Sequence, residues 1–427
     1  MASNHFIIVG AGYVGLTAAI ELTLKGFRVE VFEAAKEFTT AGDILFINPS
    51  VTGVLSKWGS TLKEVEEISS VQDKQTVYDW KGDVIVQQRQ QLTRDGFPAL
   101  ISPRGYLHLA MYRYVVSIGV KIHFGTPITD VFEEDDVAGV YVDGKRFEAS
   151  GVIATDGIHS KVRAKILKDE SRPSSSGFAI YRSFFDIDRL LDDPKTRRFA
   201  EGDEDEISVW IGKDTHAVLL TDKNLGKIGA FLTHRDEQDV EESYTASGNL
   251  DHLLKFIEGW DESLRAVFRK APADKLFGWK LFWRDPLSDW TSPKGRIVLA
   301  GDASHPHLPS SASGAMQAVE DGVTLGALAD ALGAQNVPDL FRTFRLIRSE
   351  RTNLTQRLGW ENRYKFHHTD WDAVKANPGW AKAYAYDNAK AALESVKSGS
   401  PFQNTNVPEG HRVQEWSIND LIQLEAK

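Results

Sequence analysis

The N-terminal pattern of apolar and polar residues predicts a strand, a helix and a second strand within about thirty residues. Residues 6–9 form an unbroken apolar run, as expected of a parallel strand that is buried on both faces. Residues 14–24 favour a helix, and Lys25-Gly26 supplies its C-terminal stop. Residues 28–32 predict the second strand, which completes a β-α-β unit.

The middle of the chain, residues 177–283, predicts a sheet of a different kind. Apolar and polar positions alternate there in short segments, which acidic, Gly-rich or Asn-rich connections separate. This alternation indicates antiparallel strands with one face toward a partner layer. The clearest segments are residues 207–211, 217–221 and 228–233.

The parallel-strand pattern returns near residue 296, and residues 315–331 then favour a helix. Because similar patterns stand at both ends of the β-rich region, we expect the first domain to be discontinuous. The residues after 341 read mostly as helices. The predicted division is an α/β domain of residues 1–70, 100–172 and 285–360, a β-rich domain of residues 71–99 and 173–284, and a C-terminal helical tail of residues 361–427.

Length, composition and charge narrow the class of protein. At 427 residues the chain is too long for one core, and its 11 Trp and 22 Phe supply material for packed domains. A net charge of −10 argues against a general binder of nucleic acid or anionic membranes. No apolar run reaches the ~18 residues of a membrane span, and no secretory signal is visible, so we expect a cytoplasmic protein. The sequence does not indicate an oligomeric state.

Gly10, Gly12 and Gly15 follow the first predicted strand directly and open the predicted helix. In this context the spacing predicts a dinucleotide site, because the glycines permit a tight turn, close approach of a pyrophosphate and close packing of helix on strand. Glu33 stands 18 residues after Gly15, where its carboxylate can accept hydrogen bonds from ribose hydroxyls. A glycine cluster in an ordinary turn is the alternative, and the motif does not say which dinucleotide binds.

Two further motifs stand in the same order as in a known family. Residues 151–163 contain an Asp-Gly motif, and residues 301–309 with 314–321 contain a Gly-Asp motif before a helix. With the glycine motif, they resemble the class A flavoprotein aromatic hydroxylases, the family of p-hydroxybenzoate and salicylate hydroxylases. Weaker matches at residues 103–108 and 181–182 resemble the fungal salicylate-hydroxylase-like branch, which contains many tailoring enzymes of secondary metabolism.

The resemblance implies an α/β fold: a Rossmann-like FAD-binding domain with a mixed sheet, an inserted antiparallel β-sheet substrate domain and a C-terminal helical region. It also implies one FAD, which we expect to be non-covalently bound because the chain has no cysteine for a cysteinyl link. The residues implied to bind FAD are Gly10, Gly12 and Gly15 at the pyrophosphate, Glu33 at the adenosine ribose, Arg104 at the phosphate or ribityl region, Asp302 at the ribityl chain, Pro309 near the oxygen-reacting edge, and Gly314 and Ala315 at the pyrimidine ring. Asp156, with Arg163 as a companion, is linked in the family to FAD and to pyridine nucleotide, although its acid could simply fix a turn.

The activity implied by the resemblance is a monooxygenase that consumes NADPH or NADH and O2. The reduced nicotinamide reduces FAD, reduced FAD reacts with O2 to form a C4a-hydroperoxide, and the distal oxygen passes to an electron-rich carbon of a phenolic, indolic or polyketide-type small molecule. The cofactor carries that chemistry, while the protein excludes water and orients the substrate. No second G-x-G-x-x-G motif stands in a β-α-β context, in keeping with a nicotinamide cofactor that binds transiently.

The β-rich region supplies the candidate substrate residues. Arg182 is the first, because a guanidinium can hold a phenolate or carbonyl and because it matches the family's Tyr-Arg element; a surface ion pair is the alternative. His216, His234 and Trp283 are further candidates for the catalytic site. A lone histidine on a strand is more often structural than an acid or base.

Other activities fit the same motifs. A Baeyer-Villiger or epoxidising flavoprotein would use the same fold, and a flavin-binding regulatory protein would keep the motifs without turnover. A flavin-dependent halogenase fits less well, because residues 279–283 differ from that family's tryptophan motif and lie in another place. Residues 41–44 depart from the hydroxylase pattern. His305 and His307 lack a supporting carboxylate cluster, so no metal site is predicted.

Overall fold

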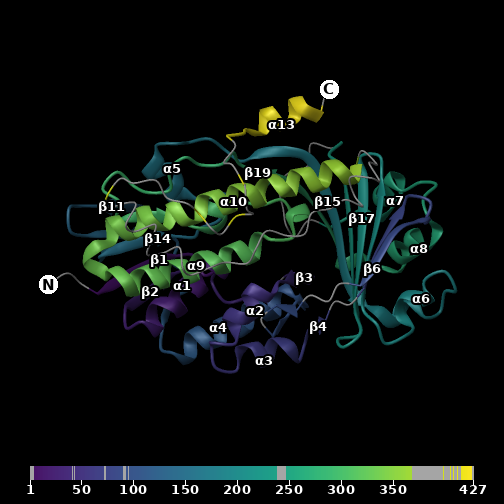
Figure 1. Ribbon diagram of the computed structural model, residues 1–427, viewed down its shortest axis with the longest axis horizontal. Helices are drawn as coiled ribbons and strands as arrows, with labels where there is room; N and C mark the ends of the chain where they lie inside the picture. Colours follow the sequence, from purple (N-terminus) through teal and green to yellow (C-terminus); the bar gives the residue numbers. More distant parts are fainter. Residues whose placement is uncertain are drawn as a thin grey trace.

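A five-stranded parallel sheet, in the order β10-β2-β1-β14-β20, forms one end of the molecule (Figure 1). Its strands are β1 (His5–Val9), β2 (Arg28–Phe32), β10 (Lys121–His123), β14 (Gly151–Ala154) and β20 (Ile297–Leu299). The predicted β-α-β unit is confirmed, because α1 (Tyr13–Leu24) joins β1 to β2. The computed structural model describes residues 4–40, 42, 44–71, 74–89, 93–94, 96–237, 247–367, 398, 404, 407, 411 and 415–425.

Helices and a small sheet share one hydrophobic core with these strands. Phe6 contacts Phe341 of α10, and Phe32 contacts Phe147 of β13, so the sheet packs against both. The surrounding elements are α2 (Pro49–Leu55), α3 (Thr61–Glu66), α4 (Arg104–Ser117), α5 (Lys161–Leu167), α9 (Gly314–Leu332), α10 (Val337–His367), β11 (Asp130–Glu133), β12 (Ala138–Val142) and β13 (Lys145–Ala149). The helix predicted for residues 315–331 is thus confirmed as α9.

A seven-stranded sheet, in the order β19-β15-β18-β17-β16-β5-β6, stands at the other end of the molecule (Figure 1). Its strands are β5 (Lys74–Asp79), β6 (Val84–Arg89), β15 (Ser174–Asp186), β16 (Glu206–Gly212), β17 (Thr215–Asp222), β18 (Lys227–Arg235) and β19 (Leu276–Trp283). Every neighbouring pair is antiparallel except β16 and β5, which run parallel. The exception arises where a hairpin from an earlier part of the chain joins β16. Smaller pairings involve β3 (Ile44–Ile47), β4 (Ser70–Val71) and β9 (Leu100–Pro103), and β7 (Thr93–Arg94) with β8 (Phe97–Pro98).

The two faces of the seven-stranded sheet have different neighbours. One face packs against α6 (Arg197–Ala200), α7 (Leu250–Phe256) and α8 (Glu262–Lys270), with Trp210, Leu219 and Leu232 in that core. The opposite face carries Phe178 and Ile180, which share a cluster with Leu308 of the Gly-Asp motif. This second face therefore meets the part of the molecule that holds the sequence motifs.

The separate cores agree with a division into two folding units, and we keep the predicted domain boundaries as a proposal. Most of the predicted helical tail lies outside the described residues, which include only α13 (Ile418–Glu425) as a separate helix there. No helix within the described ranges is long and apolar enough to cross a membrane.

Candidate active site

The three glycines of the first motif occupy a turn at the carboxyl end of β1. Gly10 has φ +101°, a left-handed conformation that favours glycine, and its N–H donates to the Phe32 carbonyl (2.8 Å). A Cβ on Gly15 would lie 2.0 Å from the Gly10 oxygen, whereas a Cβ on Gly12 would have no atom of the described residues within 4 Å. The motif therefore combines a tight turn and close packing with an open stretch of backbone at Gly12.

Glu33 joins this turn to the end of β2. Its Oε2 accepts a hydrogen bond from the Ala11 N–H (2.7 Å), and its Oε1 accepts one from the Ala35 N–H (2.7 Å). His108, which the sequence reasoning missed, supports the same loop, because its Nε2–H donates to the Ala11 carbonyl (2.7 Å). Each carboxylate oxygen has a second lone pair, so a further donor such as a ribose hydroxyl can still bind.

The Asp-Gly motif also touches the glycine turn, through a residue that was not predicted as a site residue. Thr155 follows β14 and donates its hydroxyl to the carbonyls of Val9 (2.8 Å) and Gly10 (3.0 Å). Its position directly after a parallel strand was the signal that could have identified it, because neighbouring parallel strands end at one edge of the sheet. Thr155 thus contacts the two successive carbonyls at the start of the glycine turn.

Asp156 has its carboxylate committed to the start of α5. Its Oδ1 accepts from the Ser160 hydroxyl (2.6 Å), and its Oδ2 accepts from the N–H groups of Lys161 (2.9 Å) and Val162 (3.3 Å). Burial nevertheless raises the pKa of Asp156. Through these contacts the Asp156 carboxylate fixes the turn before α5, which is one of the two roles that the sequence left open. A contact between Asp156 and a cofactor stays a prediction.

Asp302 lies in the short 3-10 turn Gly301–Ala303 that follows β20. Burial raises the pKa of its carboxyl, while the nearby charges of His305 and Arg104 oppose that effect. The residue is nonetheless accessible to water, and within the described part of the chain its carboxylate has no hydrogen-bond partner. A carboxyl oxygen that is accessible and has no partner among the described residues is suited to a ligand with hydroxyl donors. Arg104, at the start of α4, is also accessible.

The first and third motifs meet through the close packing of α1 on α9. A Cβ on Gly322 of α9 would lie 2.5 Å from Thr17 of α1, and one on Gly301 would lie 2.9 Å from Val14. Both helices begin without a side-chain cap and without an acidic residue in the first turn. Their helix dipoles therefore favour negatively charged groups at both starts.

The α9 start is approached by a compact turn that carries Pro309. Residues Pro309–Ser311 form a 3-10 turn, and Ala312 then takes the left-handed φ of +47°. Gly314 and Ala315 begin α9 and are partly accessible, and Pro309 is exposed. The turn thus presents Pro309 and the two helix-start residues together on an accessible surface.

Arg182 lies on the face of the seven-stranded sheet that meets these motifs. Its guanidinium carbon is 4.3 Å from the ring centroid of Trp279 and 5.7 Å from that of Phe277. Phe231 stands opposite Arg182 in the neighbouring strand. All four side chains are half-buried, so they form a partly accessible aromatic wall around a cation.

The structure does not bring the other predicted catalytic residues to that wall. His234 lies on the helix-covered face, where its ring stacks on Phe256 at 3.8 Å and burial lowers its pKa to about 4. Trp283 is 1% exposed and stacks on Trp360 at 4.7 Å. His216 is also buried, with its Nδ1 2.7 Å from the Nε2 of His367. All three side chains are at most 6% exposed and none belongs to the aromatic wall, so a catalytic role for them stays a prediction.

A small basic pocket lies beside the Asp-Gly motif. Its volume is about 310 Å³, and its charged lining consists of Arg163, Arg172 and Arg284 with Asp169 and Asp285. Arg163 is 4% exposed and pairs with Asp169 (3.2 Å), but within the described residues its Nε and Nη1 have no hydrogen-bond partner. Arg284 is held by the Ile158 carbonyl (2.8 Å). Three arginines against two aspartates make this pocket locally positive.

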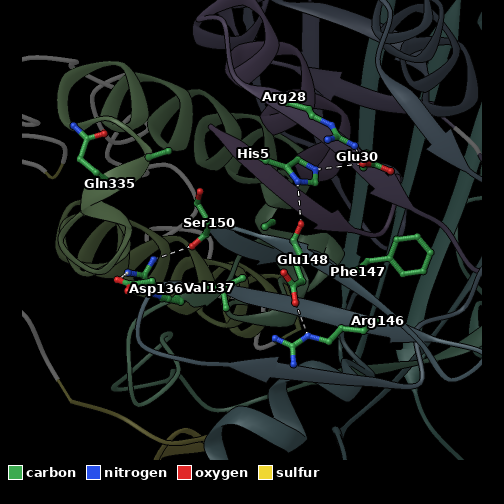
Figure 2. A pocket seen from close by; sticks show the side chains of 13 residues that line it. His5, Arg28, Glu30, Asp136, Val137, Arg146, Phe147, Glu148, Ser150 and Gln335 are labelled. Carbon is green, nitrogen blue, oxygen red and sulfur yellow. Dashed lines mark hydrogen bonds and ion pairs between the residues drawn. The ribbon is translucent and has the colours of Figure 1, made fainter. Parts of the chain in front are cut away.

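A larger cavity, of about 860 Å³, opens at the opposite edge of the parallel sheet (Figure 2). His5 and Arg28 begin β1 and β2, whereas the glycine turn and Glu33 follow the carboxyl ends of the same strands. Ligands of such sheets bind at the carboxyl ends. The charged lining is balanced between Arg28, Arg146 and Arg296 on one side and Glu30, Asp136 and Glu148 on the other. This cavity therefore carries no ligand assignment.

Comparison with known proteins places these features in context. The family described as FAD binding domain matches residues 4–358 of the chain. The asperlicin C monooxygenase of Petromyces alliaceus is 31% identical over 381 residues, covering 87% of this chain and 82% of that protein. The FAD-dependent monooxygenase okaB of Penicillium ochrochloron is 30% identical over 425 residues, covering 94% of each chain. The crystal structure of CtdE in complex with FAD and substrate 4 has a TM-score of 0.84 at 30% identity, covering 92% of this chain and 98% of CtdE.

Proposed function

This chain belongs to the FAD-binding domain family and is an FAD-dependent monooxygenase, and from this premise we propose that it uses NAD(P)H and O2 to oxygenate an electron-rich aromatic small molecule. The observation that carries the proposal is that the glycine turn, Asp302 and the start of α9 lie together, and that Phe231 and Trp279 of the aromatic wall pack against the cluster that contains Leu308 of the Gly-Asp motif. The named relatives are fungal proteins, which supports a role in fungal secondary metabolism.

The residues present fit FAD. Among the described residues the backbone at Gly12 has open space, and the adjoining start of α1, which has no side-chain cap there, presents the positive end of its helix dipole to a pyrophosphate. Glu33 has free lone pairs for a ribose, and Asp302 is an accessible acceptor for ribityl hydroxyls. The dipole at the start of α9 favours a reduced, negatively charged flavin ring. When bound, FAD supplies the two-electron chemistry with NAD(P)H and O2.

The protein's own part is to bind and orient the substrate and to exclude water. We assign substrate orientation to the aromatic wall, in which Trp279 and Phe231 offer flat apolar surfaces and Arg182 offers a cation to a phenolate or carbonyl. The cluster that contains Leu308, Phe178 and Ile180 closes the space between the sheet and the Pro309 turn with apolar side chains. No described side chain at the wall is a carboxylate or histidine, so we assign no proton acceptor there.

The basic pocket at Arg163 is the candidate contact for NAD(P)H. A dinucleotide carries phosphates, and guanidinium groups bind phosphates by paired, charge-assisted hydrogen bonds. The unsatisfied guanidinium atoms of Arg163 support this assignment, since a buried donor without a partner is costly. The neighbouring Asp-Gly motif links the pocket to the glycine turn through Thr155.

The deciding experiment supplies 18O2 and NADPH or NADH to the purified FAD-loaded protein with a panel of phenolic and indolic compounds. We expect substrate-stimulated oxidation of the nicotinamide and one 18O atom in a hydroxylated product. Label in an ester or lactone would favour the Baeyer-Villiger alternative, and label in an epoxide or its rearranged product would favour an epoxidising enzyme. Nicotinamide oxidation that no compound stimulates would favour the regulatory alternative.

A further inference from the structure

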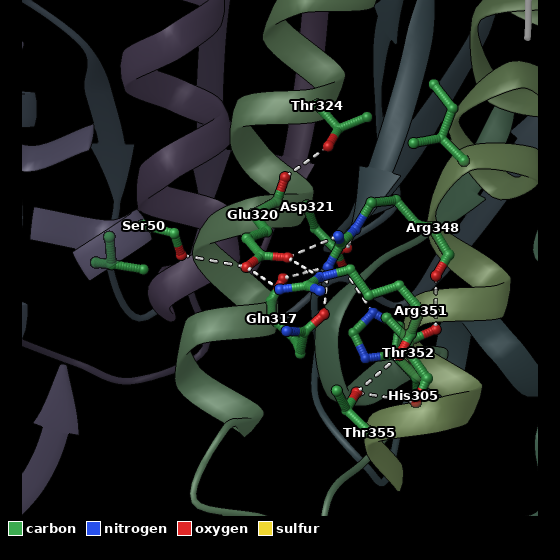
Figure 3. Close-up of polar contacts among 12 residues, drawn as sticks. Ser50, His305, Gln317, Glu320, Asp321, Thr324, Arg348, Arg351, Thr352 and Thr355 are labelled. Carbon is green, nitrogen blue, oxygen red and sulfur yellow. Dashed lines mark hydrogen bonds and ion pairs between the residues drawn. The ribbon is translucent and has the colours of Figure 1, made fainter. Parts of the chain in front are cut away.

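A cluster of buried charges joins α9 to α10 beneath the Gly-Asp turn (Figure 3). Two acidic residues of α9, Glu320 and Asp321, face two arginines of α10, Arg348 and Arg351, and all four are at most 4% exposed. Burial alone would raise the pKa of both acids, but the neighbouring cations outweigh it and hold each pKa at about 2. Both carboxylates are therefore charged throughout the neutral range.

The two acids have different partners. Glu320 accepts hydrogen bonds from Arg351 (Nε, 2.7 Å), Arg348 (Nη1, 2.8 Å) and the Ser50 hydroxyl of α2 (3.3 Å). Asp321 uses its Oδ1 for Arg348 (Nε, 2.7 Å). Its other carboxylate oxygen, Oδ2, faces the turn that carries Asp302.

That second oxygen, Oδ2, holds the Gly-Asp turn directly. It accepts a hydrogen bond from the Gly301 N–H (2.8 Å) and another from the His305 Nε2–H (2.7 Å). These donors stand on either side of Asp302, and Gly301 has the left-handed φ of +61°. One carboxylate oxygen therefore ties down both ends of the segment on which Asp302 stands.

We propose that Asp321 is a positioning residue for FAD, which sets the Asp302 turn against the start of α9 through Gly301 and His305. The inference rests on the proposed contact of Asp302 with the ribityl chain. Asp321 belongs to α9, whose start would face the flavin ring in the proposed site, so its hydrogen bonds to the turn would hold both proposed flavin contacts in one unit. Arg348 completes the unit, because it clamps Asp321, Glu320 and the Gln317 side chain (2.7 Å) at the same time.

Asp321→Asn and Glu320→Gln form a matched pair that separates positioning from general stability. Each replaces a buried charge by a neutral side chain of the same shape, and each leaves Arg348 with one neutral partner. Only Asp321→Asn weakens the contacts with Gly301 and His305. The measurements on the full-length protein are the FAD dissociation constant, from flavin fluorescence, and the thermal unfolding midpoint without FAD.

We expect both variants to unfold at lower temperature, since each leaves a buried arginine poorly compensated. The FAD dissociation constant is expected to rise at least about tenfold in Asp321→Asn, and to stay within about threefold of wild type in Glu320→Gln. If Asp321→Asn and Glu320→Gln bound FAD with equal affinity, whatever their thermal unfolding midpoints, the positioning role of Asp321 would be overturned. If either variant fails to fold, Arg351→Lys replaces Glu320→Gln and Asp321→Glu replaces Asp321→Asn, with the same expectations.

A double substitution tests whether Asp321 acts through Asp302. In an Asp302→Asn background, Asp321→Asn is expected to weaken FAD binding by less than it does alone, because the contact that it positions is already impaired. Full additivity would contradict the proposal. Unchanged FAD binding in Asp302→Asn alone would instead show that the assumed ribityl contact is wrong, so the two failures are distinguishable.

Discussion

Three glycines within one six-residue motif have different surroundings, and the difference predicts what a methyl group does at two of them, Gly15 and Gly12. In Gly15→Ala the new Cβ would lie 2.0 Å from the Gly10 oxygen, so the turn must shift and the free energy of unfolding is expected to fall by about 1–3 kcal/mol. In Gly12→Ala the methyl group meets no atom of the described residues and φ is an ordinary −73°, so the change in stability is expected to stay within about 1 kcal/mol.

FAD affinity should separate the same two variants. In Gly12→Ala the methyl group projects into the open space assigned to the pyrophosphate, so we expect weak FAD binding by a well-folded protein. Urea unfolding without FAD and flavin fluorescence titration check both expectations. If Gly12→Ala bound FAD as wild type does, the pyrophosphate would not lie over this stretch of backbone.

Asp302 and Arg182 are assigned to different ligands, and this predicts a crossed result. Asp302→Ala is expected to lose FAD occupancy, whereas Arg182→Ala keeps FAD and loses about tenfold to a hundredfold in kcat/KM for the aromatic substrate. Arg182→Lys is the matched control, because it keeps the charge but not the planar group beside Trp279. We expect its kcat/KM to lie between those of wild type and Arg182→Ala. An Asp302→Ala protein replete with FAD and of normal activity would contradict the first assignment.

At the scale of elements, the turn from β17 into β18 contains an unfavourable charge. Asp222 is fully buried, and burial, with a smaller contribution from Asp205, raises its pKa to about 6. In the unfolded chain the pKa is about 3.9, so the folded state binds this proton more tightly. The stabilisation that comes from this tighter proton binding is fully present below about pH 4. It is lost as the pH rises from about 4 to 6, and it is absent above that range.

Asp222→Asn removes this pH dependence and is expected to stabilise the protein at pH 7.5 by about 1–3 kcal/mol, with the advantage vanishing near pH 4. The asparagine oxygen can still accept from the Leu225 N–H, which Asp222 binds at 3.0 Å. Urea unfolding at several pH values measures the effect. Asp186→Asn is the control, because Asp186 is exposed and its hydrogen bond with Lys227 lowers its pKa. A stabilisation of Asp222→Asn that did not change with pH would refute the assignment.

The elements themselves were largely predictable where the pattern is local. The strand, helix and strand of the N-terminal unit, the helix α9 and the strands β16, β17 and β18 follow from contiguous residues. The pairing of distant strands does not. Register places Phe231 opposite Arg182, so that His234, three residues further along β18, falls on the other face of the sheet. No local pattern could reveal that Arg182 and His234 are separated in this way.

The candidate site shows the same limit. The glycines and Asp302 could be found because motifs mark them, but their supporting partners stand elsewhere in the chain. Asp321 is twenty residues from Gly301 and returns to it only because α9 folds back along the turn. Thr155 reaches the glycine turn across two adjacent parallel strands. Such contacts depend on tertiary packing, which a single sequence does not encode in its spacing.

At the scale of the whole molecule, the net charge of −10 repels an anionic cosubstrate, so we expect the proposed cosubstrate NAD(P)H to bind at a locally positive pocket. Arg172 is an exposed residue of the pocket beside the Asp-Gly motif. We expect Arg172→Ala to raise the KM for NADPH about threefold to tenfold, with FAD affinity and thermal stability unchanged. Raising the ionic strength should increase the wild-type KM and reduce the difference between wild type and variant, because salt screens exposed charges.

The control for this prediction must change the net charge equally at another place. Arg146 lines the cavity at the opposite edge of the sheet, where its partners are Glu134 (2.8 Å) and Glu148 (2.8 Å). Arg146→Ala therefore makes the whole protein more negative by one charge without touching the basic pocket. If both variants raised the KM for NADPH equally, the effect would come from net charge alone, and the pocket at Arg163 would lose its assignment. A rise confined to Arg172→Ala would locate NAD(P)H binding at that pocket.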